Sequence, residues 1–379
     1  MCATSATLSV SASCGGSCSA TRGTVEGGLP ALRIIDRDTY RAELVADAAA
    51  AIPTPEDLHF DAALRLLRLL ATSSSVSDAS IESRVMNTVA YYSSDTGSIT
   101  VIDRGEAMSL LDDVGTLAHE MTHAIQDRRH GLRAFRTAVD GTDARFARDA
   151  VVEGDATFVG RYYRTAADGR TLTETEWRRY FAGWRDGLLA DIAVAEDRWP
   201  LARRGLLYPL GGNLAASIAL REGASALDTL FLDPPATALA VSVDSLAGEG
   251  TLPAEEIDCA PPAAPPGMVT SSENRMGVPL VYAFVAEVGR IAEGWSAAQR
   301  IVADRLTIYG DGIGGRTAVA WRIRSATETD ARGLIALLRT LGESNGASIV
   351  EGRDIVVALT NDAGAGTWVN DALAPCAIP

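Results

Sequence analysis

The segment from residue 109 to residue 131 reads SLLDDVGTLAHEMTHAIQDRRHG and contains the pattern HExxH at His119, Glu120 and His123. Its apolar residues recur with the period of one helix face, which predicts an amphipathic helix. At about 100° per residue, the two histidines lie about 40° apart and nearly opposite the apolar stripe. Residues four apart on a helix are neighbours, so both imidazoles can reach one metal ion. We therefore expect a metal-binding helix here.

The glutamate inside this pattern gives it a chemical meaning. Glu120 borders an ion held by His119 and His123 without binding it. A zinc ion lowers the pKa of a coordinated water to about 7, and an adjacent carboxylate can take the proton as that water attacks an amide carbonyl. The same carboxylate can later protonate the leaving amine. The alternative is an exposed helix face with two solvated histidines, but a chain with only four histidines rarely contains HExxH by chance.

A catalytic zinc site also needs a third protein ligand, with one position left open. No histidine follows His130, so a carboxylate has to serve. The best candidate is Glu153, in the helical segment DARFARDAVVEGDATFVGRYYR at residues 143–164. The next residue, Gly154, has no side chain to keep a neighbouring helix away. The alternative for Glu153 is an ordinary carboxylate on a helix surface.

The two motifs also carry a resemblance. Glu-Gly-x-Ala on a second helix after HExxH resembles the gluzincins, zinc peptidases whose third ligand is that glutamate. More closely, HEMTHAIQD followed by VVEGDAT is similar to a group of bacterial cell-envelope metallopeptidases with HExxHAxQD and EGDA motifs. The similarity continues through YPLGGNLAASIALREGASALDTLFLDPPAT, GWSAAQRIVADRLTIY and WRIRSATETDARGLIALL, from about residue 85 to residue 359. It implies a zincin-like fold, one Zn²⁺ per chain with His119, His123 and Glu153 as ligands, and Glu120 as general base.

The spacing departs from the family in one place. The interval from His123 to Glu153 is longer than in the best-known gluzincins, so we expect an inserted loop around residues 131–143. Asp127 and Asp155 are candidate acceptors for the second N–H of a ligand imidazole, or else solvated acids.

Candidate donors to a developing oxyanion are His130, Tyr162 and Tyr163. For His130 we favour an interaction with the end of its helix, and for the two tyrosines aromatic packing is the more common role. None of the three is therefore assigned by the sequence.

Alternating residues before the histidine helix predict a hairpin with strands near 86–92 and 98–103. We expect an exposed strand at Ile99–Ile102 that pairs with an extended peptide substrate, the alternative being an ordinary sheet edge. Upstream, residues 54–70 predict a helix with His59 in its first turn.

The whole sequence predicts an α+β protein. Residues 1–30 contain almost nothing that could be buried, so we expect a disordered leader. Residues 31–255 are the expected zincin-like core, mostly helical with a small sheet. The proline-rich residues 256–267 predict a linker or extended crossing. Residues 268–379 alternate between strand and helix patterns and predict a smaller α+β unit packed on the core.

Composition excludes several classes of function. A net charge of −15 over 379 residues disfavours a nucleic-acid partner. All 34 basic residues are arginines, which excludes lysine nucleophiles and Schiff bases. No stretch reaches the roughly 18 apolar residues of a membrane-spanning helix. We expect a peptide or protein substrate and no membrane span.

The cysteines bear on localisation. Cys2 directly after Met1 fits a lipid anchor, with an ordinary flexible tail as the alternative. A disulfide between Cys259 and Cys376 would pin the C-terminal tail in an oxidising compartment, and two unpaired thiols are the alternative. We expect a protein outside the cytoplasm, secreted or anchored to the cell envelope.

These features together predict a zinc-dependent peptidase. Two other classes stay open on the sequence alone. The first is a catalytically inactive, zinc-containing binding or structural protein of the cell surface, and the second is a zinc hydrolase that acts on non-peptide amides.

Overall fold

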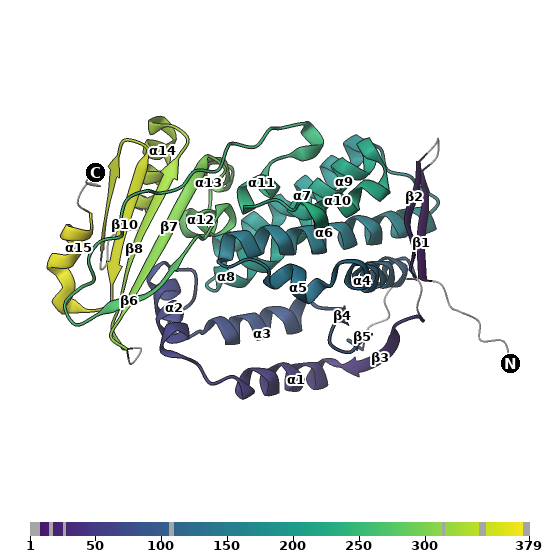
Figure 1. Ribbon diagram of the computed structural model, residues 1–379, viewed down its shortest axis with the longest axis horizontal. Coiled ribbons are helices and arrows are strands. Elements are labelled where there is room, and N and C mark those ends of the chain that lie inside the picture. Colours follow the sequence, from purple (N-terminus) through teal and green to yellow (C-terminus); the bar gives the residue numbers. More distant parts are fainter. Residues whose placement is uncertain are drawn as a thin grey trace.

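The computed structural model describes residues 8–14, 18–25, 28–105, 110–312, 315–340 and 346–373. Helices fill the middle of the molecule, and a five-stranded sheet lies at one end (Figure 1). A three-stranded sheet lies beside the helices, and a two-stranded hairpin lies at the opposite end. The protein is therefore α+β, as the sequence predicted.

The α-helices are α1 (Arg37–Ala50), α2 (Pro55–Leu66), α3 (Val76–Asn87), α4 (Leu110–His130), α5 (Leu132–Thr137), α6 (Thr142–Ala167), α7 (Glu174–Val194), α8 (Arg198–Pro200), α9 (Leu207–Glu222), α10 (Thr229–Leu232), α11 (Ala238–Ser242), α12 (Val278–Val285), α13 (Ile291–Ala298), α14 (Glu328–Thr340) and α15 (Gly366–Ala372). Shorter helical turns are η1 (Leu201–Gly205), η2 (Ala224–Asp228), η3 (Ser245–Ala247) and η4 (Ala363–Ala365). Over the described ranges, none of these helices has the length and apolar character needed to span a membrane.

The strands are β1 (Leu8–Cys14), β2 (Cys18–Val25), β3 (Ala31–Asp36), β4 (Ala90–Ser93), β5 (Ser98–Asp103), β6 (Val269–Asn274), β7 (Ile301–Gly310), β8 (Thr317–Ser325), β9 (Gly346–Glu351) and β10 (Asp354–Thr360). β1 and β2 pair antiparallel within residues 1–30, where we expected disorder. Runs of Ser and Thr on both sides of a Gly-Gly pair have the composition of a hairpin, which explains the difference.

The three-stranded sheet corrects the expected peptide-binding strand. Its order is β3-β5-β4, with β5 parallel to β3 and antiparallel to β4. β5 is therefore central, and Ile99 and Ile102 are buried. The prediction that Ile99–Ile102 is exposed for pairing is wrong, because β3 joins the sheet from a distant part of the sequence and covers that edge. Among the described strands, β4 keeps a free edge, and it lies against α4.

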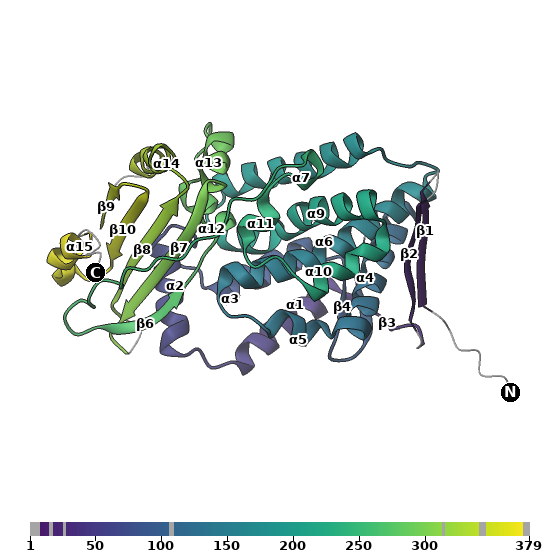
Figure 2. The same cartoon turned by 45° about the horizontal axis from the view of Figure 1, so that its top comes forward.

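Helix α6 packs between α4 and α9 (Figure 2), and glycines set the separations. A Cβ atom at Gly154 would lie 2.1 Å from the backbone carbon of Gly211, in α9. A Cβ atom at Gly160 would lie 2.7 Å from the carbonyl oxygen of Gly115, in α4. Only glycine permits both approaches. The expectation that Gly154 allows close helix packing is confirmed.

The five-stranded sheet has the order β6-β7-β8-β10-β9, with all neighbours antiparallel. One face supplies Leu306, Val319 and Trp321 to the main core, which also contains α2, α9, α12 and α14. The other face packs on α15 through Tyr309 and Trp368. The main core thus contains residues from both sides of the proline-rich segment 256–267.

That proline-rich segment runs in an extended form along the sheet. Tyr309 donates from its hydroxyl to the carbonyl of Pro262 at 2.6 Å, and Trp368 donates from Nε1 to the carbonyl of Ala263 at 2.7 Å. Cys259 is disulfide-bonded. Cys376, the partner expected from the sequence, lies outside the described residues.

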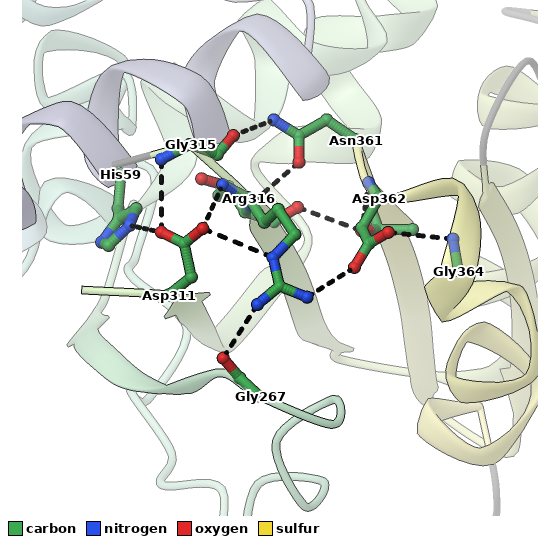
Figure 3. A network of polar contacts seen from close by, with 10 residues as sticks. His59, Gly267, Asp311, Gly315, Arg316, Asn361, Asp362 and Gly364 are labelled. Atoms are coloured by element: carbon green, nitrogen blue, oxygen red, sulfur yellow. Dashed lines mark hydrogen bonds and ion pairs between the residues drawn. The ribbon is translucent and has the colours of Figure 1, made fainter. Parts of the chain in front are cut away.

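Helix α2 is attached to the end of the sheet by a buried histidine. A Cβ atom at Gly310 would lie 2.0 Å from the His59 ring, so only glycine leaves room for it. Nδ1 of His59 lies 3.1 Å from Oγ of Ser271, and Nε2 lies 3.7 Å from Oδ1 of Asp311. Asp311 also accepts from the backbone N–H of Arg316, which continues the network across the sheet (Figure 3). This network holds the first helices against the C-terminal sheet.

Candidate metal centre

The structure brings the three predicted ligand side chains together. Nε2 of His119 and Nε2 of His123 lie 3.0 Å apart. Oε2 of Glu153 lies 3.5 Å from the first nitrogen and 3.3 Å from the second. The histidines come from α4 and the glutamate from α6, so the convergence depends on how these two helices pack. Among the described residues, these three form the group suited to hold a metal ion.

The triangle of ligand atoms has the dimensions of a zinc site. For tetrahedral coordination with bonds of 2.0–2.1 Å, neighbouring ligand atoms lie about 3.3 Å apart. The three separations in this site, 3.0, 3.3 and 3.5 Å, bracket that value. Two imidazoles and one carboxylate are also ligands that Zn²⁺ accepts. The residues therefore fit such an ion, with a fourth position left open.

Close helix packing explains why Glu153 reaches the histidines. A Cβ atom at Gly160 would lie 3.2 Å from Cβ of His119, so α6 touches the base of a ligand side chain. On its other side, α6 presses on α9 at Gly154 and Gly211. Because α6 is confined between these contacts, the carboxylate has little freedom to leave the site.

The insertion expected at residues 131–143 contains the helix α5. From this helix, Arg136 donates a 2.8 Å hydrogen bond to Oε1 of Glu153. One carboxylate oxygen is thereby bound by arginine, and the other faces the histidines. The insertion therefore orients a ligand, a role that its length alone did not predict.

A relay of buried polar groups orients His123. Its Nδ1 lies 2.9 Å from Oε1 of Gln126, and Nε2 of Gln126 donates to Oδ2 of Asp155 at 2.9 Å and to the carbonyl of Val152 at 3.0 Å. Asp155 thus supports the imidazole through Gln126 and does not contact it directly. We did not predict Gln126, although its position three residues after a ligand histidine on one helix was a usable signal.

The other acidic candidate has a structural role. Asp127 accepts from the hydroxyl of Tyr92 at 3.0 Å and from the backbone N–H of Leu132 at 2.9 Å. It therefore ties β4 and the start of α5 to the end of α4. It does not serve as an acceptor for a ligand imidazole.

The three oxyanion candidates from the sequence lie among packing contacts. His130 stacks on Phe231 with ring centroids 4.3 Å apart, and its Nε2 lies 3.4 Å from Asp228. Tyr162 is buried in an aromatic cluster, and Tyr163 packs against the same cluster. The positions of the two tyrosines agree with aromatic packing, the role that the sequence indicated as the more common one for them.

Tyr208, at the start of α9, is an aromatic residue close to the ligand His119. Its ring centroid lies 6.2 Å from that of His119. The negative charge of Glu153, together with burial, raises the pKa of Tyr208 well above its usual value, so the phenol keeps its proton. Sequence reasoning missed this residue because α9 is remote from both motifs along the chain.

Glu120 lies beside the triangle and is 5% exposed. Its Oε2 is buried and has no hydrogen-bond partner within the described part of the chain. Glu120 and His119 both line a cleft of about 530 Å³, whose walls come from α3, α4, α6, α7, η1 and α9. Because this oxygen of Glu120 accepts no hydrogen bond from the described residues, it is available to take a proton from a molecule bound in the cleft.

Electrostatics also favour a cation between the ligands. Burial lowers the pKa of His123, but the charge of Glu153 and its hydrogen bond outweigh burial and raise that pKa to about 9. Burial raises the pKa of Glu153, but His123, His119 and Arg136 together hold it well below its usual value. The carboxylate is therefore ionised, and the site attracts positive charge.

Comparison of this chain with family models, with curated proteins and with solved structures found no match. The functional assignment consequently rests on the geometry of the site and on the sequence motifs.

Proposed function

We propose that this protein is a zinc-dependent peptidase with a zincin-like core, in which His119, His123 and Glu153 hold one Zn²⁺ per chain. The observation that carries the proposal is the triangle of ligand atoms, with sides of 3.0, 3.3 and 3.5 Å, beside a cleft. The resemblance of HEMTHAIQD and VVEGDAT to the gluzincin motifs supports it independently.

A bound zinc ion supplies Lewis acidity, which acidifies water and polarises a carbonyl. Glu120 acts as the general base: its free oxygen accepts a proton from the attacking water as that water's oxygen bonds to the carbonyl carbon of the substrate. Glu120 then transfers the proton to the leaving nitrogen as the carbon–nitrogen bond breaks. Burial without a competing hydrogen bond suits Glu120 to both transfers.

Tyr208 is the proposed donor to the carbonyl oxygen as negative charge develops there. Its phenol keeps its proton because the charge of Glu153 disfavours a phenolate. A donor already directed at the developing charge stabilises the transition state more than the ground state. Its ring also forms part of the wall of the cleft.

The proposed substrate is a peptide in an extended conformation. The beginning of β4, including Ala90, lines the cleft, and β4 keeps a free edge among the described strands. Backbone groups at such an edge pair with an added strand. This contact replaces the one that we expected at β5.

The proposal includes a location outside the cytoplasm, either secreted or anchored to the cell envelope at the N-terminus. The disulfide at Cys259 supports it, because such bonds persist in oxidising compartments.

The decisive experiment measures zinc content and peptide cleavage in the same preparations. We expect one zinc per wild-type chain and cleavage of a mixed peptide library. Glu120→Gln should retain the zinc and lose cleavage by a factor of at least about 100. His123→Ala should lose both. One zinc per chain with no cleavage of any peptide would favour the inactive binding protein.

A further inference from the structure

The cleft beside the metal centre is rich in arginine although the chain as a whole is acidic. Four arginines line it, Arg84, Arg161, Arg164 and Arg204, against the acidic residues Asp112, Asp191 and Glu120. The net charge of the chain is −15. Basic residues outnumber acidic ones in this cleft, whereas acidic residues outnumber basic ones in the chain as a whole, so the cleft is suited to an occupant that carries negative charge.

Two of these arginines are already engaged. Arg164 lies 2.8 Å from Asp112 in an ion pair, and Nε of Arg84 donates to the hydroxyl of Tyr40 at 3.3 Å. Arg161 and Arg204 differ, since neither makes an ion pair or a side-chain hydrogen bond with any residue that the structure describes. They are therefore the arginines free to bind a ligand.

Arg161 is held in place by an aromatic ring. Its guanidinium carbon lies 4.3 Å from the ring centroid of Tyr180, in α7. Its Nε is buried without a hydrogen-bond partner. A buried donor left unpaired is unfavourable, so the arrangement favours a ligand that supplies an acceptor. The planar guanidinium matches a carboxylate, which can accept two parallel hydrogen bonds from it.

A second unpartnered group lies on the same face of α6. The hydroxyl of Thr157 is buried, has no hydrogen-bond partner among the described residues, and lines the cleft. Thr157 is four residues after Glu153 and four before Arg161, and residues at this spacing are neighbours along one helix face. Glu153, Thr157 and Arg161 therefore follow one another along one face of α6, from the metal ligand to a donor hydroxyl and then to a guanidinium.

Arg204 lines the same cleft from η1, a different element from the one that carries Arg161. It lies in η1, one helical turn before Tyr208, and its positive charge acts on the Tyr208 phenol. Its side chain is exposed and lines the same cleft as Arg161. On the α6 side, Gly160 packs directly on His119, and Arg161 is the next residue in the chain. An extended peptide advances about 3.3 Å per residue, so a peptide bound at the metal centre needs only a few residues to reach Arg161.

We propose that Arg161, Thr157 and Arg204 form a carboxylate-binding subsite, so that this peptidase selects peptides with an acidic group close to the scissile bond. The group is either the free C-terminal carboxylate or the side chain of Asp or Glu. The subsite deepens the proposed function and rests on it for its role in catalysis.

Binding can be tested without catalysis. Zinc-loaded Glu120→Gln protein is titrated with pairs of peptides that differ only in a free or amidated C-terminus, or only in Asp against Asn. Trp184 lines the cleft, so its fluorescence reports occupancy alongside calorimetry. In one of the two pairs, we expect the charged peptide to bind at least about tenfold more tightly than the neutral one. A difference in the first pair identifies the C-terminal carboxylate as the ligand, and a difference in the second identifies an acidic side chain.

Arg161→Gln in the same background should abolish this preference and leave the affinity for the neutral peptide unchanged. Arg204→Gln, at an exposed position, should reduce the preference and serves as a second variant if the first does not fold. Arg332→Gln is the matched control, because Arg332 is exposed on the distant helix α14 and contacts Glu328 and Thr329 of the same helix. It should leave both affinities unchanged.

The outcomes separate the subsite from the peptidase activity. Equal binding of charged and neutral peptides, or a preference that survives in both arginine variants, overturns the subsite. If wild-type protein cleaves charged and neutral peptides at equal rates, the peptidase stands and the subsite falls. If it cleaves nothing but binds carboxylates through Arg161, the subsite stands and the peptidase falls.

Discussion

Arg136 donates a 2.8 Å hydrogen bond to Oε1 of Glu153 and leaves the other oxygen of that carboxylate facing the two histidines. The contact links the inserted helix α5 to the metal centre. It also adds a positive charge that, together with His123 and His119, outweighs burial and holds the pKa of Glu153 well below its usual value.

The first prediction concerns Arg136 itself. Arg136→Met should weaken zinc binding about 10- to 100-fold, because Glu153 loses the contact that orients it. Competition with a chelator measures the dissociation constant. Arg133→Met is the matched control, since Arg133 lies on the same short helix and pairs with the exposed Asp95. Equal zinc affinity in the two variants would show that Arg136 does not orient the ligand.

The second prediction concerns the relay behind His123. Gln126 is fully buried, and Gln126→Leu removes both the acceptor for His123 and the donor to Asp155. We expect a loss of about 1–3 kcal/mol in the free energy of unfolding and a weaker affinity for zinc. Chemical denaturation and chelator competition measure the two effects. A variant with wild-type values in both assays would contradict the relay.

The third prediction concerns the separation of α6 and α9. Gly154→Ala would put a methyl group 2.1 Å from the Gly211 backbone, so the helices must move apart and Glu153 moves with them. We expect a loss of about 3 kcal/mol or more in unfolding free energy, together with loss of zinc binding. Gly183→Ala is the control, because Gly183 lies in α7 with open space around its Cα. That change should stabilise the protein by about 0.5–1 kcal/mol. Similar effects in the two variants would refute the role assigned to Gly154.

The fourth prediction is a pH dependence of stability. Burial, with the nearby Asp304, raises the pKa of Asp143 from its ordinary 3.8 to about 7. Between about pH 4 and pH 7, the folded protein therefore keeps a proton that the unfolded chain releases. The contribution of Asp143 to stability is thus largest at acid pH and is lost as the pH rises towards 7.

Asp143→Asn removes this contribution while its side-chain oxygen can still accept from the backbone N–H of Ala238. As the pH rises from 4.5 to 7.5, the wild type should lose about 1–4 kcal/mol of unfolding free energy relative to the variant. Denaturation at several pH values measures the shift. Parallel pH profiles for the two proteins would rule out an elevated pKa at Asp143.

Local spacing predicted the helix that carries the two histidines. That helix begins and ends within one residue of the expected segment, as α4. The second strand of the hairpin before it was predicted at 98–103, which are the bounds of β5, but the first strand, β4, begins later than expected, at Ala90. β4 starts later because helix α3 continues to Asn87. Over so few residues, alternation of apolar and polar side chains does not distinguish the start of a strand from the end of a helix.

The sequence by itself determined which residues face one another on a single helix, because the period of 3.6 residues fixes the positions of His119 and His123 whatever surrounds them. It also determined the ligand types, and through Gly154 it indicated where two helices meet. Only the tertiary structure decided that β5 is central, that Gln126 stands between His123 and Asp155, and that Arg136, Tyr208 and Arg161 border the site. These contacts join helices far apart along the chain, and their register depends on side-chain packing across the whole core, which no local periodicity encodes.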